Sequence, residues 1–481
     1  MNRWFATLQQ ALEREGIPED REKAPLVPVQ HYAESLADLR HAFARWHRQC
    51  PAAGVGVRVF VDGTAKKCSE GPTGNIDGEF RALLTGAGIP YGWTDLSEAL
   101  AIPPGEIHAS HDCLERVRGV VREGSGGAAV VLGSGSITDL VKHALQAENV
   151  NIPLVSIPTA LTVTAFTSAF AIIDFHGAKR TLQSRPVSAA FWVKPFLECA
   201  PPRMSRAGYG DLLARFVAYG DWFLGYRLGV MERYDESAFR LMEPFAGGIR
   251  DAAAGFGLDR LPEDATACTA AALAMAGISM STAGETTPLS GFEHVISHAL
   301  DFLRLTAGRA LVFHGEQVAL GSLVSARTID RVLSLGNLRA VEWRDGDAGQ
   351  ALRVLENRLA AAPLPGGTGA FRGQMTAALA EFAGEYEKKA RRWAAARARI
   401  GSFVNDWDEI RRELARLTLR AADMEQLLKR SGLPCRPAET VPPTGTEEFR
   451  WAVMFAPFVR SRMNLSDMLF WMGREDLVVL P

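Results

Sequence analysis

The sequence predicts an α/β domain followed by a longer all-α domain, and two patterns support this division. In the first pattern, short valine-rich segments alternate with helical ones: "GVGVRVFVD" (54–62), "GAAVVLGSGSITDLVKHAL" (127–145) and "IPLVSIPTA" (152–160). The first and third segments have the composition of short strands, and the second has the order strand, glycine turn, helix. Strands that alternate with helices are typical of a parallel, doubly wound sheet.

The second pattern begins near residue 200, where the apolar residues take a helical period. We expect helices over 211–228, 265–283, 292–304, 314–333, 371–400 and 403–431. The dipeptide Pro201-Pro202 is a reasonable domain boundary, because proline interrupts regular structure. The expected organisation is a helical N-terminal extension over 1–50, an α/β domain over 51–200 and a helical domain over 201–481.

Composition narrows the functional class. The chain has 481 residues, 47% of them hydrophobic, and a formal net charge of −2, which argues against a dedicated nucleic-acid or anionic-membrane surface. Its six cysteines are scattered without a C-x-x-C pair, which is typical of reduced intracellular thiols. We find neither the apolar run of a signal peptide nor a charge-free stretch of about 18 apolar residues. We expect a cytoplasmic, homo-oligomeric enzyme with no nucleic-acid partner and no membrane span.

A glycine turn separates the strand and the helix within 127–145. Glycines at Gly133 and Gly135, with Ser134 and Ser136 beside them, permit a close backbone approach to a phosphate, and the following helix N-terminus offers N–H donors. A plain strand–helix turn is the alternative, because G-x-G alone is a weak signal. Asp62, at the end of an earlier strand, is suited to ribose hydroxyls and favours NAD over NADP, although aspartate also commonly begins a turn.

Three of the ten histidines stand close together in the sequence, at His294, His298 and His314. His294 and His298 share one face of an expected helix, and the 20 residues from His294 to His314 leave room for a turn and a second, antiparallel helix. Asp211, near the start of the first helix of the helical half, is the best third ligand. Two imidazoles and a carboxylate suit zinc, iron or nickel with open coordination positions. The alternative is that these are ordinary core or surface histidines.

Five segments in this order resemble the sn-glycerol-1-phosphate dehydrogenases, within the wider group of iron-containing alcohol dehydrogenases and 3-dehydroquinate synthases. The segments are "GSGSITDLVKHA", "IPTALTVTAFTS", "AGYGDLLARFVAYGDW", "SGFEHVISH" and "FHGEQVALG", and the tail "FAPFVRSRMNLSDMLFWMG" is similar as well. The likeness covers roughly residues 55–475. The fold class it implies is an α/β N-terminal dinucleotide-binding domain plus an all-α C-terminal metal-binding domain, and it implies a part in phospholipid metabolism.

The resemblance also implies roles for individual residues. The family's metal ligands fall on Asp211, His294 and His314, its substrate-contacting histidine on His298, and a lysine near the substrate on Lys179. Its NAD(P) contacts fall on the following residues: Gly133, Ser134, Gly135, Ser136, Ile137, Thr159, Ala160, Leu161, Thr162 and Ser168.

Two positions depart from the family pattern. Thr164 stands where an acidic residue usually holds a substrate hydroxyl, and a threonine carries no charge. Phe292 stands where a small polar residue is common. A reshaped substrate pocket is therefore expected.

The expected activity is a metal-assisted, NAD(P)-linked reduction of a phosphorylated ketone such as dihydroxyacetone phosphate. The phosphate needs cations, for which the candidates are Lys179, Arg215, Arg460 and Arg462; the last two also fit a surface position. Two alternatives remain: a sugar-phosphate cyclase of the dehydroquinate synthase type, and a catalytically silent relative that binds NAD or metal. The expected "GGKTGIN" segment of the cyclases is absent. The intact ligand set argues against the silent relative, whereas the replacement at Thr164 argues for it.

Overall fold

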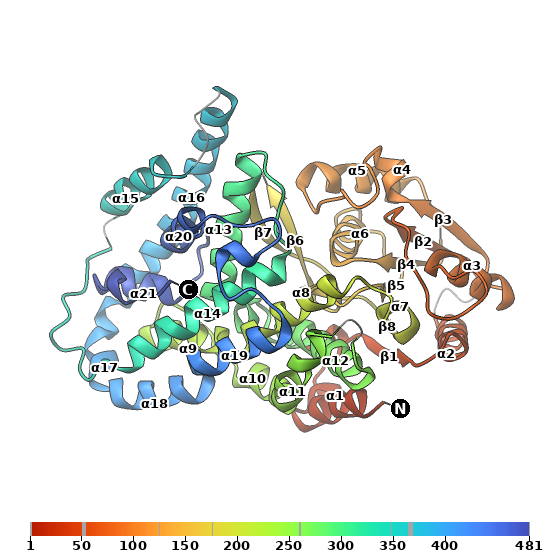
Figure 1. Ribbon diagram of the computed structural model, residues 1–481, viewed down its shortest axis with the longest axis horizontal. Helices are drawn as coiled ribbons and strands as arrows, with labels where there is room; N and C mark the ends of the chain where they lie inside the picture. Colours follow the sequence, from red (N-terminus) through yellow and green to blue (C-terminus); the bar gives the residue numbers. More distant parts are fainter. Residues whose placement is uncertain are drawn as a thin grey trace. The chain divides into compact units, whose positions relative to one another are not determined.

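The structure is a computed structural model that describes residues 2–50, 54–124, 126–175, 177–258, 261–346, 348–363 and 369–480. The chain divides into two compact units, whose elements are labelled in Figure 1. Unit 1 comprises Met1–Phe175, Arg180–Leu212 and Ser237–Thr286. Unit 2 comprises His176–Lys179, Leu213–Glu236 and Thr287–Pro481.

Unit 1 is built on six parallel strands in the order β1-β8-β5-β4-β2-β3. Their bounds are β1 Val29–Ala33, β2 Val57–Val61, β3 Tyr91–Asp95, β4 Ala128–Gly133, β5 Leu154–Pro158 and β8 Ala189–Val193. Strands β4, β5 and β8 are buried at every residue, as apolar strands covered on both faces of a parallel sheet should be. The predicted α/β class with a parallel sheet is confirmed.

Two groups of helices pack against this sheet. Alternate strand residues such as Val59, Val130 and Phe191 form one core with Phe43 of α2 (Leu36–Gln49) and Phe80 of α3 (Ile76–Gly86). Helix α6 (Gly135–Ala147) packs on β2, β4 and β5 and also on α5 (His111–Arg122). The other helices wholly or mainly in unit 1 are α1 Arg3–Arg14, α4 Leu96–Leu100, α7 Lys194–Leu197, α8 Pro202–Leu212, α10 Glu236–Met242, α11 Ala246–Phe256 and α12 Glu263–Ala283.

The first 50 residues differ from the predicted helical extension. They contain β1, which pairs with β8 from Val29↔Ala189 to Ala33↔Val193, and helix α2, which contributes to the core of the sheet. The segment "VQHYA" lies at the edge of the sheet, and only its last residue is buried. An edge strand needs no apolar alternation, so its sequence carries little strand signal.

The division between the two units differs from the boundary predicted at residue 200, because helix α12 lies after that residue in the sequence. It belongs to unit 1, and every residue over 265–282 is buried. A helix that is apolar on all sides needs cover on all sides, which here comes from α1, α8, α11 and the 3-10 turn Thr164–Phe166. Among the described residues, α12 is the one helix long and apolar enough to pass for a membrane span, and that apolar window is wholly buried.

Unit 2 is helical, apart from the start of β7. Its helices are α9 Ala218–Leu228, α13 Phe292–Thr306, α14 His314–Leu333, α15 Ala348–Ala360, α16 Gly369–Ala396, α17 Ile400–Asn405, α18 Trp407–Leu417, α19 Ala421–Ser431, α20 Thr446–Phe455 and α21 Leu465–Trp471. Strand β7 (Ala178–Gln183) pairs with β6 (Phe170–Phe175) in a separate two-stranded sheet, and its residue Lys179 belongs to unit 2. Helices α13 and α14 contact each other closely, and the predicted helices over 292–304 and 314–333 are confirmed.

Two glycine-to-alanine substitutions in unit 1 should have opposite effects on stability. A Cβ at Gly208 in α8 would clash with the carbonyl oxygen of Leu161, whereas a Cβ at Gly119 in α5 would meet nothing within 4 Å. Alanine is about 1 kcal/mol better than glycine inside a helix, so Gly119→Ala should raise the urea midpoint. Gly208→Ala should lower it, because displacing packed backbone costs roughly 1–3 kcal/mol. A Gly208→Ala variant as stable as the parent would contradict this close approach.

Candidate metal centre and cofactor turn

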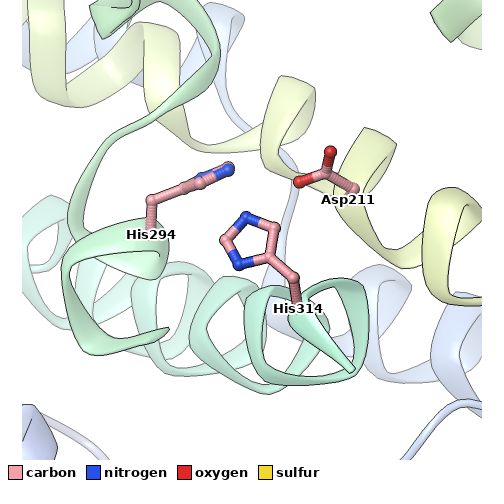
Figure 2. Close-up of side chains that lie close together, drawn as sticks. All are labelled: Asp211, His294 and His314. Carbon is pink, nitrogen blue, oxygen red and sulfur yellow. The ribbon is translucent and has the colours of Figure 1, made fainter. Parts of the chain in front are cut away.

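Three side chains that the sequence singles out lie together. Asp211 is the penultimate residue of α8, His294 lies in the first turn of α13, and His314 is the first residue of α14. One potential ligand atom from each of the three lies within 4.8 Å of the others, and Figure 2 shows the three side chains turned toward one another. The ring centroids of His294 and His314 are 5.2 Å apart. The structure therefore brings together the acid and the two histidines expected from the sequence.

Each of the two histidines has its Nδ1 atom held by a neighbour on α13. His294 Nδ1 donates to Glu293 Oε1 at 2.9 Å, since a carboxylate only accepts, and His314 Nδ1 lies 3.0 Å from the Ser297 hydroxyl. In each ring, Nδ1 is therefore engaged by a neighbour on α13. Imidazoles oriented by a hydrogen bond through the second ring nitrogen are characteristic of metal-binding histidines.

A second buried carboxylate stands behind Glu293. Asp221 Oδ2 accepts from the Phe292 amide at 2.5 Å, while Glu293 Oε1 accepts from the Gly291 amide at 2.6 Å. Burial and the charge of Glu293 raise the pKa of Asp221 well above its usual value. The shift favours the protonated form of Asp221 beside the Glu293 carboxylate that faces His294.

The carboxylate of Asp211 is fixed within unit 1. Its Oδ2 accepts from the backbone amide of Thr164 at 2.9 Å, and both residues are buried. Two imidazoles, each oriented through its Nδ1 atom, and one oriented carboxylate match the donor preferences of zinc, iron or nickel. The residues present therefore fit a divalent metal.

His298 stands apart from these three residues. The guanidinium of Arg460, which only donates, lies 3.3 Å from His298 Nε2, so this nitrogen accepts and Nδ1 carries the proton. Burial, followed by the charges of Arg460 and Lys179, lowers the pKa of His298 well below its usual value. Its Nδ1 is buried without a hydrogen-bond partner among the described residues. His298 is therefore a neutral ring with one N–H left to donate.

Three of the four candidate cations approach α13 or the residues before it. Lys179 Nζ is 2.5 Å from Asp301 Oδ2, Arg460 contacts His298, and Arg462 donates to Ser290. Arg460 is only 7% exposed, so its alternative position on the surface is wrong. The fourth cation, Arg215, is buried in the short turn Leu213–Phe216.

The glycine turn has the predicted geometry within unit 1. Strand β4 ends at Gly133, Ser134 is the N-cap of α6 but makes no side-chain capping bond, and the helix begins at Gly135. The uncapped first turn leaves its N–H groups for another acceptor. Ser136 and Ile137 follow in this first turn, and Ile137 is buried against Gly133.

The segment after β5 lies beside this turn. Thr159 donates its amide to the carbonyl of Gly133 at 3.2 Å, and a Cβ at Gly135 would clash with Val163. Ala160 and Leu161 are buried, and the hydroxyl of Thr162 is buried without a hydrogen-bond partner among the described residues. The orphaned hydroxyl in this segment and the uncapped amides of the turn each fit a polar ligand.

Two other predicted cofactor residues are already engaged. Asp62 Oδ1 is 2.5 Å from Lys66 Nζ and accepts from the Thr64 amide at 3.0 Å, although Oδ2 faces the Gly133 position. Ser168 is buried and donates its hydroxyl to the Phe170 carbonyl at 3.1 Å. Asp62 is thus placed beside the turn with part of its charge neutralised, and the Ser168 hydroxyl has a structural bond.

Four polar residues that hold this site were not singled out from the sequence: Glu293, Ser297, Asp301 and Gln317. All four lie on α13 or α14, and the first three follow one another at intervals of four residues. This spacing in an otherwise apolar helix was the available signal, because it places polar groups along one buried side.

Comparisons with known proteins find a matching family model and similar solved structures. A family model described as iron-containing alcohol dehydrogenase matches residues 95–193. A solved structure described as a probable glycerol dehydrogenase from Sinorhizobium meliloti is 20% identical, with a TM-score of 0.47 over 75% of this chain and 97% of that one.

Curated relatives carry more sequence identity. A glycerol-1-phosphate dehydrogenase of Pyrococcus furiosus, named for NAD(P)+, is 33% identical over 48% of this chain and 61% of its own length. The chain thus spans less than two thirds of that relative. The enzyme of the same name from Pyrococcus abyssi is 31% identical over 57% of this chain and 73% of its own length. The resemblance seen in the sequence motifs is confirmed: the chain belongs to the glycerol-1-phosphate dehydrogenase family.

Proposed function

We propose that the chain is a metal-dependent, NAD(P)-linked dehydrogenase that reduces a phosphorylated ketone, with dihydroxyacetone phosphate and glycerol 1-phosphate as the substrate pair. The observation that carries the proposal is the set of Asp211, His294 and His314, whose potential ligand atoms lie within 4.8 Å of one another and whose two histidines are each held at Nδ1. Membership of the family supports the reaction. The proposal also includes that the protein is a cytoplasmic homo-oligomer that acts in phospholipid metabolism. This part rests on the family resemblance alone.

The three ligands supply the place for the metal. Asp211 provides an oxygen, and His294 and His314 each provide Nε2, for a divalent ion such as zinc, nickel or iron. When bound, such an ion acts as a Lewis acid that polarises a carbonyl oxygen. Three protein ligands leave coordination positions open for a substrate oxygen.

The hydrogen bonding of His298 limits which of its two nitrogens can contact the substrate. Because Arg460 occupies its Nε2, the neutral ring has a single N–H, on Nδ1, for a substrate oxygen. This arrangement suits orientation of a hydroxyl or carbonyl group better than a proton relay, which needs an acceptor on one nitrogen and a donor on the other. Lys179 and Arg462 supply positive charge around α13 for a phosphate.

The turn Gly133–Ser136 is proposed to hold the cofactor pyrophosphate. The uncapped amides at the start of α6 and the buried Thr162 hydroxyl support this assignment. We propose a modest preference for NAD(H), because a carboxylate at Asp62 disfavours a second phosphate on the ribose, and the 2.5 Å contact with Lys66 weakens that effect.

The metal assignment is tested by removing one ligand. The parent protein should hold about one divalent ion per chain, and His314→Ala should lose most of it, because only two protein ligands remain. His41→Ala, at an exposed histidine of α2, is the control and should keep the metal. Metal content of dialysed protein, measured by elemental analysis, gives the answer, and undiminished metal in His314→Ala would rule out the assignment.

The cofactor assignment is tested at Gly135. Gly135→Val should weaken NADH binding by about tenfold or more, because a side chain there blocks the close approach of pyrophosphate to the amides. A Cβ at position 135 would also clash with Val163 within the protein. The double variant Gly135→Ala/Val163→Ala removes this internal clash and keeps a side chain at position 135, so weakened binding in it is due to the ligand and not to misfolding. NADH fluorescence titration should show weakened binding in both, and unchanged affinity in Gly135→Val would count against the turn.

The substrate assignment is tested at Thr164, whose amide contacts Asp211. If this position has lost a hydroxyl-binding carboxylate, Thr164→Asp should raise dihydroxyacetone phosphate reduction by about tenfold to a hundredfold, since a hydrogen bond to a charged group is worth ~1.5–3 kcal/mol. Thr164→Asn matches the shape without the charge and should give no such gain. A parent enzyme with high activity that falls in Thr164→Asp would show that Thr164 is fitted to its own substrate.

The same assays separate the alternatives. A dehydrogenase consumes NADH in proportion to the ketone reduced, whereas a cyclase regenerates its NAD and shows no net consumption. A silent relative would bind NADH or metal without turnover on any phosphorylated ketone.

A further inference from the structure

We infer that Ser297, Gln317 and Asp301 are positioning residues that form a hydrogen-bond chain of fixed direction, which runs from Lys179 to His314 and holds His314 in the Nδ1–H form, with Nε2 as its metal-binding atom. The inference rests on the proposed metal site, and it adds a device that sets the tautomer of one ligand. All five residues belong to unit 2.

The hydrogen-bond chain is continuous, and the distance at each of its steps is short. Lys179 Nζ is 2.5 Å from Asp301 Oδ2, and Asp301 Oδ1 accepts from Gln317 Nε2 at 2.7 Å. Gln317 Oε1 accepts from the Ser297 hydroxyl at 2.5 Å, and Ser297 Oγ lies 3.0 Å from His314 Nδ1. Ser297, Asp301 and Gln317 are each at most 2% exposed, so water does not compete for these bonds.

The direction of the chain follows from its charged end. Burial raises the pKa of Asp301, but the charge and hydrogen bonds of Lys179 and the bond from Gln317 outweigh burial, so the pKa is lowered and the group is a carboxylate. A carboxylate only accepts, so the amide nitrogen of Gln317 must face it and the amide oxygen must face Ser297.

This orientation leaves one choice for each remaining group. Ser297 has a single hydroxyl proton, and Gln317 Oε1 takes it. The Ser297 oxygen can then only accept from His314, which places a proton on His314 Nδ1 and the lone pair on Nε2. In Figure 2 one ring nitrogen of His314 faces the other labelled residues and the second faces away, as this assignment requires.

The two histidine ligands are therefore fixed by different means. His294 is held by the carboxylate of Glu293 at 2.9 Å, whereas His314 is held by a neutral hydroxyl whose orientation comes from Asp301 two hydrogen bonds away. The charge of Asp301 is balanced by Lys179. The hydrogen-bond chain thus fixes the tautomer of His314 through a neutral hydroxyl and not through a second carboxylate in contact with a metal ligand.

The first test removes the acceptor of His314. Ser297→Ala should weaken zinc binding by about tenfold to a hundredfold, the usual effect of losing a partner behind a metal ligand. Ser322→Ala is the matched control: Ser322 is also a buried serine of the helix pair, but its hydroxyl has no hydrogen-bond partner among the described residues. Zinc affinity is measured on the full chain by competition with a chromophoric chelator. Equal affinity in Ser297→Ala and the parent would overturn the inference.

The second test concerns direction. Gln317→Met removes the acceptor of the Ser297 proton, so the hydroxyl becomes free to donate to His314 Nδ1 and should move the ring proton to Nε2. Circular dichroism checks that the variant folds. Zinc affinity should fall although the serine and the histidine are both intact, and unchanged affinity would show that direction is unimportant.

The third test reads the tautomer directly and separates this inference from the proposed function. Nitrogen-15 histidine labelling of the metal-free protein gives signals from ten histidines, and the spectrum of His314→Ala identifies the one from His314. The parent should show the Nδ1–H form, and Ser297→Ala should shift toward Nε2–H. This result would support the hydrogen-bond chain even if the protein binds no metal. An Nε2–H form of His314 in the parent would overturn the inference even if the protein does bind metal.

Discussion

The buried polar network between α13 and α14 is the constraint on which the site depends. Both helices are largely apolar, so hydrophobic packing alone tolerates more than one register between them. The bonds from Ser297 to Gln317 and from Gln317 to Asp301 link the two helices at 2.5 and 2.7 Å. Each such group left unpaired in the core would cost roughly 1–3 kcal/mol, so a displaced register carries a penalty that the observed one avoids. The register that satisfies these groups also sets His314 beside His294.

The balance of charge around the histidines follows the same logic. The Glu293 side chain faces His294, and burial, followed by the charge of Glu293, raises the pKa of the neighbouring Asp221 carboxyl. Asp301 is paired with Lys179. Arg460 lies against a histidine whose pKa is depressed by burial and by that arginine, so the pair does not hold two positive charges. Asp301 and Arg460 thus each have a specific partner, which is what burial of charge requires.

The sequence predicts the parts of this fold that have a strong periodic or positional signal. The valine-rich strands, the glycine turn at Gly133 and the helix pair that carries the histidines are found where expected. Strand β1 was missed because an edge strand with partly exposed residues has no apolar alternation. The place of α12 in unit 1 was missed for another reason: a helix that is apolar on all sides has no face that indicates its neighbour.

Within the site, residue type and spacing identify the histidines and the acid but not the groups that orient them. Glu293, Ser297 and Gln317 are common residue types whose role appears only once the distances to the rings are known. Arg460 is similar, because a buried arginine against a histidine is distinguishable from a surface one only in three dimensions.

X-ray absorption spectroscopy of the zinc-loaded protein tests the central claim most directly. The account predicts a first shell of nitrogen and oxygen atoms at about 2.0–2.2 Å, with the multiple scattering of two imidazole rings and no sulfur. A sulfur ligand at about 2.3 Å, or scattering from fewer than two imidazoles, would contradict a site made of Asp211, His294 and His314.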